Sequence, residues 1–129
     1  MSEWSDLPNA ALIDWVIGDV AVNHGDWDAV YSAAGIAAAY SAAWDVARKV
    51  VVAAARNAVR YAARGASYSA AWDAAGNACL ALIAYDHAGS LFDMPLKQVQ
   101  VMAYLGQPAA VLMLPACRVR EKRRELIHE

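Results

Sequence analysis

An alanine-dense run over residues 40–88 constrains this chain more than any other feature. Within it the hexapeptide Tyr-Ser-Ala-Ala-Trp-Asp at 40–45 recurs twenty-eight residues later at 68–73, and a partial copy precedes it at 31–34. Alanine loses no side-chain entropy in a helix and buries no polar group, and the run contains no proline. The run is therefore predicted to be helical over most of its length.

A glycine and two serines divide this run into two helices. Gly65 fits a helix C-cap because glycine adopts a positive φ without steric cost. Ser67 or Ser69 fits the N-cap of the helix that follows. The two long alanine-rich helices are therefore predicted at about 40–64 and 67–88.

The first of these helices has two contrasting faces. At about 100° per residue, its small and aromatic residues gather on one side, where we expect them to pack in the core. The opposite side carries a basic stripe within an arc of about 80°: Lys49, Arg56, Arg60 and Arg64. Arg48 lies to one side of this stripe and Tyr61 lies near it. These six residues are the candidate surface for a partner or an anion.

The second helix repeats the packing face without the basic stripe. Its packing face contains Tyr68, Trp72, Ala75, Cys79, Leu82 and Ile83. The reverse carries mostly alanines, which lower the distance at which another helix can pack. Two interpretations stay open for this small reverse face: a central helix packed on both sides, or an oligomer interface.

The net charge of −2 conceals an uneven distribution along the chain. Residues 1–47 hold seven acidic residues and no lysine or arginine, whereas residues 48–64 hold five basic residues and no acid. A second basic group lies near the C-terminus: Arg118, Arg120, Lys122, Arg123 and Arg124. We expect the acidic N-terminal helix and the basic stripe to face each other or water within one fold. The alternative is that one of the two faces meets an external charged partner.

The length and composition favour one compact domain. At 129 residues the chain is expected to form a single all-α domain over 1–129, a bundle of about five or six helices around the two alanine-rich ones. Hydrophobic residues make up 60% of the chain, a share that favours self-association, so a homo-oligomer is expected. Most of the tryptophans and tyrosines are expected in the core, because they supply the bulk that alanine lacks.

The N-terminal third is predicted to contain a helix and a break. Asp6 can cap a helix that runs to about Val22, with Asp14 and Asp19 facing away from its apolar side. His24-Gly25 is expected to end this helix.

A bend is predicted before the first alanine-rich helix. In a straight helix Tyr31 and Tyr40 would lie about 180° apart, although both belong to copies of the same motif. Gly35, between them, is therefore the expected site of a bend.

Prolines mark the helices of the C-terminal third. Pro95 is expected to open a helix of about ten residues that ends at Gly106, and Pro108 to open another up to Leu114. Pro115 is expected to open or kink the last helix. The charged segment 118–129 is expected to be a solvated helix that frays at its end.

The chain contains no motif for catalysis or for metal binding. Cys79 and Cys117 are both embedded in apolar sequence and are expected to be reduced and buried. Acidic residues and histidines cluster at two places, and we interpret them as capping and solvated groups: His24, Asp26 and Asp28, and Tyr85, Asp86 and His87. We expect no catalytic activity, no metal and no cofactor.

The location is expected to be the cytoplasm. The N-terminus is acidic and lacks the basic start and apolar run of a signal peptide. The most apolar C-terminal run, 99–117, is too interrupted by polar residues and by Gly106 and Pro108 to span a membrane.

The repeats belong to a wider pattern that continues through 81–86, 91–95 and 105–116. This pattern resembles a group of small alanine-rich proteins encoded by tailed bacteriophages, over about residues 31–117. Those proteins often extend Trp-Asp-Ala-Ala and Arg-Asp-Ala-Ala tetrads much further, whereas this chain keeps the arginines and few of the aspartates. A fainter similarity, of composition, exists to alanine-rich helical immunity proteins of bacterial toxin systems. The phage resemblance implies an accessory protein.

Phages carry small cytoplasmic proteins mainly to modify the host or to block its defences. The resemblance therefore implies a non-enzymatic protein that binds and inhibits or redirects a host protein, including an anti-phage defence protein. The alternative is an oligomer that sequesters an anionic small molecule such as a signalling nucleotide, with the arginines gripping phosphates and Tyr61 stacking a base. Nucleic acid is disfavoured as a partner because the net charge is negative.

Overall fold

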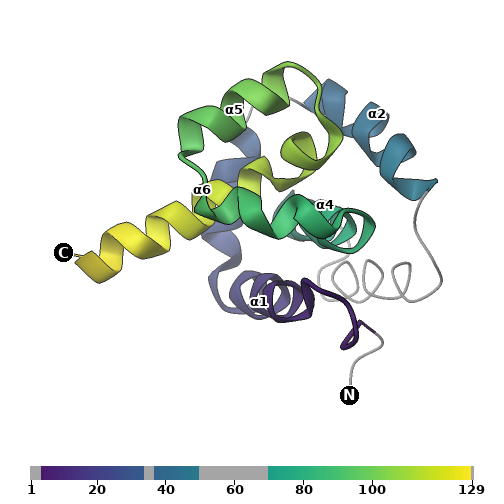
Figure 1. The fold of residues 1–129 in the computed structure, drawn as a ribbon. Coiled ribbons are helices and arrows are strands. Elements are labelled where there is room, and N and C mark those ends of the chain that lie inside the picture. Colours follow the sequence, from purple (N-terminus) through teal and green to yellow (C-terminus); the bar gives the residue numbers. More distant parts are fainter. Residues whose placement is uncertain (1–3, 34–36, 50–69, 129) are drawn as a thin grey trace.

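The computed structural model describes residues 4–33, 37–49 and 70–128, which form a helical bundle (Figure 1). The elements in chain order are α1 (Ala10–Ala33), α2 (Ala37–Arg48), α4 (Ala70–Ala84), the 3-10 helix η1 (Asp86–Asp93), α5 (Leu96–Tyr104) and α6 (Pro108–His128). No strand occurs within these three described ranges, so the predicted all-α fold is confirmed. The greater part of the first alanine-rich helix, 50–64, lies outside the described residues.

The helix α4 is central to the bundle (Figure 1) and contacts α1, α2, α6 and η1. Its small residues are buried on opposite faces, and Asp73 is exposed. The buried alanines are Ala71, Ala74, Ala75, Ala78 and Ala81. Side chains this small let neighbouring helices pack closely on both sides. The interpretation of this segment as a central, doubly packed helix is therefore confirmed.

The end of α4 differs from the predicted boundary at residue 88. The α-helix ends at Ala84, Tyr85 is extended with φ −129° and ψ 112°, and η1 follows. The buried Asn9 side chain lies at this end, where its Nδ2 donates to the carbonyl of Leu82 at 2.9 Å and lies 3.2 Å from that of Asp86. Carbonyls at a helix end need a donor, and here an amide before α1 supplies it.

The predicted end of the first helix at His24-Gly25 is a kink in the structure. The helix α1 continues to Ala33, but Asn23 has the non-helical φ and ψ values of −123° and 38°. The side chain of Asn23 also donates to Asp19 at 3.2 Å. The structure therefore has two helical stretches joined at a kink within two residues of the predicted point, which confirms a helix end there, although no separate loop intervenes.

Two tyrosines show how α1 and α2 are related. The rings of Tyr31 and Tyr40 stack with their centroids 5.6 Å apart and an angle of 16° between their planes. In a straight helix these rings would point in nearly opposite directions. The chain therefore changes direction between α1 and α2, as predicted, while Gly35 itself lies outside the described residues.

The prolines and Gly106 set the helix boundaries of the C-terminal third. Pro95 immediately precedes α5, and Gly106 follows its end with a φ of 83°, a value that favours glycine. Pro108 begins α6, and the side chain of Gln107 accepts a hydrogen bond from the backbone of Ala110 at 2.8 Å. These boundaries agree with the sequence prediction.

The helix α6 is longer than predicted. It runs from Pro108 to His128 as one helix with Pro115 inside it, and its apolar half, 109–117, is buried. The charged part from Arg118 continues this helix and contacts α1 through Arg123. Within the described residues, no helix is both long enough and apolar enough to cross a membrane.

The aromatic side chains are divided between the core and its edge. Trp27 is fully buried, and Trp4, Tyr40 and Phe92 are nearly so. Half-buried aromatics pack against this core: Trp15, Tyr31, Trp44, Trp72 and Tyr85. Tyr104 differs from them because it is 85% exposed at the end of α5. Among the described residues, all aromatic side chains except Tyr104 are thus buried in the core or packed against it, in agreement with the expectation that they supply its bulk.

The two cysteines are free and buried, as predicted. Burial raises the pKa of Cys79 and that of Cys117 to about 12 each, and Asp14 contributes to the shift at Cys79. At pH 8 we expect both thiols to react with Ellman's reagent roughly a thousandfold more slowly in the native protein than in guanidinium chloride, because the thiolate is the reactive form. A rapid native reaction of either thiol would contradict this burial.

Candidate functional site

The structure describes only the beginning of the predicted basic surface. Arg48 is the last residue of α2, and Lys49 follows it with an exposed side chain. The rest of the prediction lies outside the described residues: Arg56, Arg60, Tyr61 and Arg64. The arrangement of the basic stripe therefore stays a prediction, with Lys49 as its described and accessible member.

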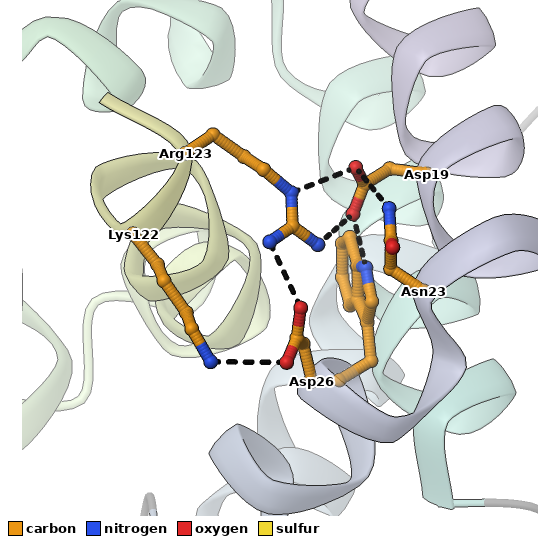
Figure 2. A network of polar contacts seen from close by, with 6 residues as sticks. Asp19, Asn23, Asp26, Lys122 and Arg123 are labelled. Atoms are coloured by element: carbon orange, nitrogen blue, oxygen red, sulfur yellow. Dashed lines mark hydrogen bonds and ion pairs between the residues drawn. The ribbon is translucent and has the colours of Figure 1, made fainter. Parts of the chain in front are cut away.

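Two acidic residues of α1, Asp19 and Asp26, are bound by side chains of α6 (Figure 2). Arg123 binds Asp19 through two parallel contacts, Nε to Oδ1 at 3.0 Å and Nη2 to Oδ2 at 2.9 Å. Its third nitrogen, Nη1, donates to Oδ2 of Asp26 at 2.9 Å. Lys122 Nζ lies 3.0 Å from the other oxygen of Asp26. One guanidinium thus joins two carboxylates on either side of the kink in α1.

Asp19 is the most enclosed member of this network. Its side chain is only 10% exposed, and it also accepts a hydrogen bond from Nε1 of Trp27 at 2.8 Å. Burial by itself would raise the pKa of Asp19, but the hydrogen bonds of Arg123 and Trp27 and the charge of Arg123 outweigh it and lower that pKa. The pKa of Asp26 is also lowered, first by Lys122 and then by Arg123. Both carboxylates are therefore ionised at neutral pH.

The prediction that Asp19 faces away was wrong. The sequence did contain a signal for the observed arrangement, since Asp19 and Asp26 are seven residues apart and so share one face of a helix. The basic pair at 122–123 is the complementary group. The predicted partner of the acidic helix was the basic stripe, whereas the basic side chains that the structure places on Asp19 and Asp26 come from α6.

Two further aspartates of α1 have structural partners. Oδ1 of Asp14 accepts a hydrogen bond from Nε1 of Trp4 at 2.8 Å. Oδ1 of Asp28 accepts one from the backbone N–H of Ala71 at 2.7 Å, in the first turn of α4. A carboxylate satisfies the free N–H groups of a helix start and interacts favourably with its dipole. Asp28 therefore caps α4 from another helix.

The two predicted clusters of acids and histidines do not converge on a common point. Asp26 contacts α6 while Asp28 contacts α4, so the residues around His24 point to different neighbours. In the other cluster, the Tyr85 and His87 rings lie 5.7 Å apart. No group of three or more possible metal ligands occurs in the described parts of the chain.

The second basic group, on α6, is largely engaged within the fold. The guanidinium carbon of Arg120 lies 4.8 Å from the ring centroid of Trp15 and 5.0 Å from that of Phe92, a cation–π arrangement. Nη2 of Arg124 donates to the carbonyl of Phe92 at 2.6 Å. Together with the pairs formed by Lys122 and Arg123, these contacts hold α6 against α1 and η1.

Described residues of the helices line the two cavities considered next. The first, here called the α6 groove, has a volume of about 480 Å³ and is lined by Phe92, Asp93, Met94, Pro95, Leu96, Cys117, Glu121, Arg124 and Glu125. The second has a volume of about 370 Å³ and is lined, among the described residues, by Tyr40, Trp44, Asp45 and Asn77. Burial raises the pKa of Tyr40, so its phenol stays protonated at neutral pH. Of these two cavities, the α6 groove is the one whose described residues combine an apolar lining with several charged side chains.

Comparison of the chain with protein-family models, with curated proteins and with solved structures finds no match.

Proposed function

We propose that this chain is a non-enzymatic phage accessory protein of the host cytoplasm, which binds a host protein through its basic stripe and inhibits or redirects it. One observation supports this assignment above others: α6 supplies the basic partners of Asp19 and Asp26, while Lys49 at the start of the stripe is exposed. The acidic face of α1 is thus used inside the fold, which favours the stripe as the external surface.

Charge indicates the kind of partner surface. The segment 48–64 carries five basic residues and no acid, so a complementary surface is rich in carboxylates. Such complementarity raises association rates and excludes partners of like charge. An anti-phage defence protein with an acidic surface is the partner class that combines this chemistry with the phage resemblance.

Neutralising the stripe is expected to abolish activity without unfolding the protein. The variant carries Lys49→Gln, Arg56→Gln, Arg60→Gln and Arg64→Gln, and its effect is measured as phage plaque formation on cells that express one defence system at a time. Wild-type protein is expected to restore plaque formation on cells that express the defence system it inhibits. The variant is expected to give at least about tenfold fewer plaques on these cells, because several charge pairs with the partner are removed.

A matched pair of single variants distinguishes an effect of the stripe from an effect of removing any exposed positive charge. Lys97 on α5 is exposed like Lys49, so Lys97→Gln is the control for Lys49→Gln. Circular dichroism and thermal unfolding confirm that each variant is folded. Full activity of a folded fourfold variant would show that the stripe is a solvated surface and would refute the proposal.

An anionic small molecule held by an oligomer is the competing ligand class. Native mass spectrometry of gently purified protein distinguishes the two, because one spectrum reports the oligomer and any bound mass. A clean apo protein supports protein binding. A mass excess of a few hundred daltons per site that is absent from the fourfold variant would instead indicate that the protein sequesters an anion and would refute the host-protein proposal.

A further inference from the structure

The α6 groove has a deep apolar part and a charged edge. Phe92 and Cys117 are 3% and 6% exposed and so lie deepest among its lining residues. Met94 and Leu96, both half-buried, continue the apolar surface toward α5. The volume of about 480 Å³ falls in the range of clefts that enclose ligands, about 300–1,000 Å³. A bulky apolar group could therefore be buried in it.

The charged side chains around this apolar part are mostly acidic. The lining contains three acidic residues, Asp93, Glu121 and Glu125, and one basic residue, Arg124. Arg124 is itself held, with Nη2 2.6 Å from the Phe92 carbonyl and 3.5 Å from Asp93. The described ion pairs involve neither Glu121 nor Glu125. These two glutamates are four residues apart on α6 and so lie on one face of the helix.

We propose that the α6 groove binds a segment of a partner protein in which a bulky apolar side chain is flanked by lysine or arginine. The apolar side chain is buried against Phe92 and Leu96, and the flanking cations meet Glu121 and Glu125. Complementarity to the acidic edge selects the cationic occupant. This interaction uses residues other than those of the basic stripe and does not depend on the function proposed above.

The openness of the groove favours a chain segment over a small enclosed molecule. The side chain of Asp93 is 85% exposed and that of Arg124 is 43% exposed, so this edge is open to solvent. An occupant can continue past the edge, as a polypeptide does. An apolar anchor in a pocket surrounded by polar contacts is the arrangement typical of energetically dominant interface residues.

A fluorescein-labelled peptide with a central tryptophan flanked on both sides by lysines tests this proposal. Fluorescence anisotropy is expected to show saturable binding to the wild-type protein. The double variant Glu121→Gln/Glu125→Gln is expected to bind about tenfold more weakly and with less dependence on salt. Its matched control, Asp73→Asn/Asp86→Asn, removes two exposed carboxylates outside the groove and is expected to bind like wild type.

Two further peptides and one measurement decide between occupants. Replacement of the tryptophan by alanine, or of the lysines by glutamate, is expected to abolish binding. Equal binding of the alanine peptide, or equal binding by the Glu121→Gln/Glu125→Gln variant, would overturn the proposal. Sedimentation of the free protein tests a second copy as occupant: self-association that disappears in this variant would assign the groove to an oligomer contact instead.

Discussion

Replacement of Gly89 by alanine is expected to lower the free energy of unfolding by about 3 kcal/mol, the sum of an overpacking cost and a weakened buried hydrogen bond. A Cβ at this position would overlap Oδ1 of Asn9 and lie 2.8 Å from Cδ1 of Leu12. The leucine can rotate, but Asn9 is held by carbonyls at the end of α4. The loss is measured by urea denaturation followed by circular dichroism.

The same substitution at another glycine provides the control. A Cβ on Gly76, inside α4, would meet nothing within 4 Å. Gly76→Ala is therefore expected to stabilise the protein by about 0.5–1 kcal/mol, because alanine is the better helix former. The double variant Asn9→Ala/Gly89→Ala should lose less stability than the sum of its single changes, since the overlapping atom is gone. Additive losses would contradict the steric explanation.

Replacement of Arg123 by methionine is expected to cost about 3 kcal/mol, because it leaves the enclosed carboxylate of Asp19 without its cation. The side chains of this pair are 20% and 10% exposed, so water compensates poorly. Thermal and urea unfolding measure the loss. The double variant Asp19→Asn/Arg123→Met should recover part of it, since no buried charge is then left unpaired.

The neighbouring Lys122 is the control for this prediction. Its side chain is 51% exposed and its partner Asp26 is 31% exposed, so Lys122→Met should cost less than about 1 kcal/mol. Both aspartates have a pKa below the usual 3.8, so their contribution is complete above that value and is lost as the pH falls through the lowered pKa. The wild type and Arg123→Met should therefore converge in stability under strong acid. An equal cost of the two methionine variants at pH 7 would refute the proposed difference in enclosure.

Local sequence signals were sufficient for both boundaries of α5 and for the start of α6. Gly106 requires no partner to stop α5, because its φ of 83° is accessible to glycine at little cost. Pro95 and Pro108 precede or begin helices because their missing N–H is not needed there. The alanine pattern likewise identified α4 as a helix that other helices can approach from two sides.

The errors arose where a distant side chain acts on the backbone. The α-helix at 70–84 ends before the predicted boundary, and Asn9, 73 residues before Leu82, donates to the Leu82 carbonyl at this end. Nothing in the local sequence of 85–88 contains this information. The position of Asp19 was misjudged for a related reason, since its burial depends on Arg123 at the other end of the chain.

The sequence alone could predict the basic stripe but not the α6 groove. The segregation of charge predicted a basic stripe, most of which lies outside the described residues, and its described member Lys49 is exposed. The α6 groove, by contrast, joins residues of η1, the turn before α5 and two turns of α6. Such a cavity depends on how three elements pack together, which periodicity within one element does not reveal.

The links from the N-terminal region to both ends of α4 also affect how the chain folds during synthesis. Asp28 accepts a hydrogen bond at the start of α4, and Asn9 donates one at its end. These two hydrogen bonds join residues that are 43 and 73 positions apart in the chain. The apolar side of α1 leaves the ribosome long before α4 exists to cover it. At about 5–20 residues per second this interval lasts seconds, in which Ile13, Val16 and Trp27 lack their final cover. We therefore expect the nascent chain to be exposed to aggregation and to chaperone capture before α4 is translated.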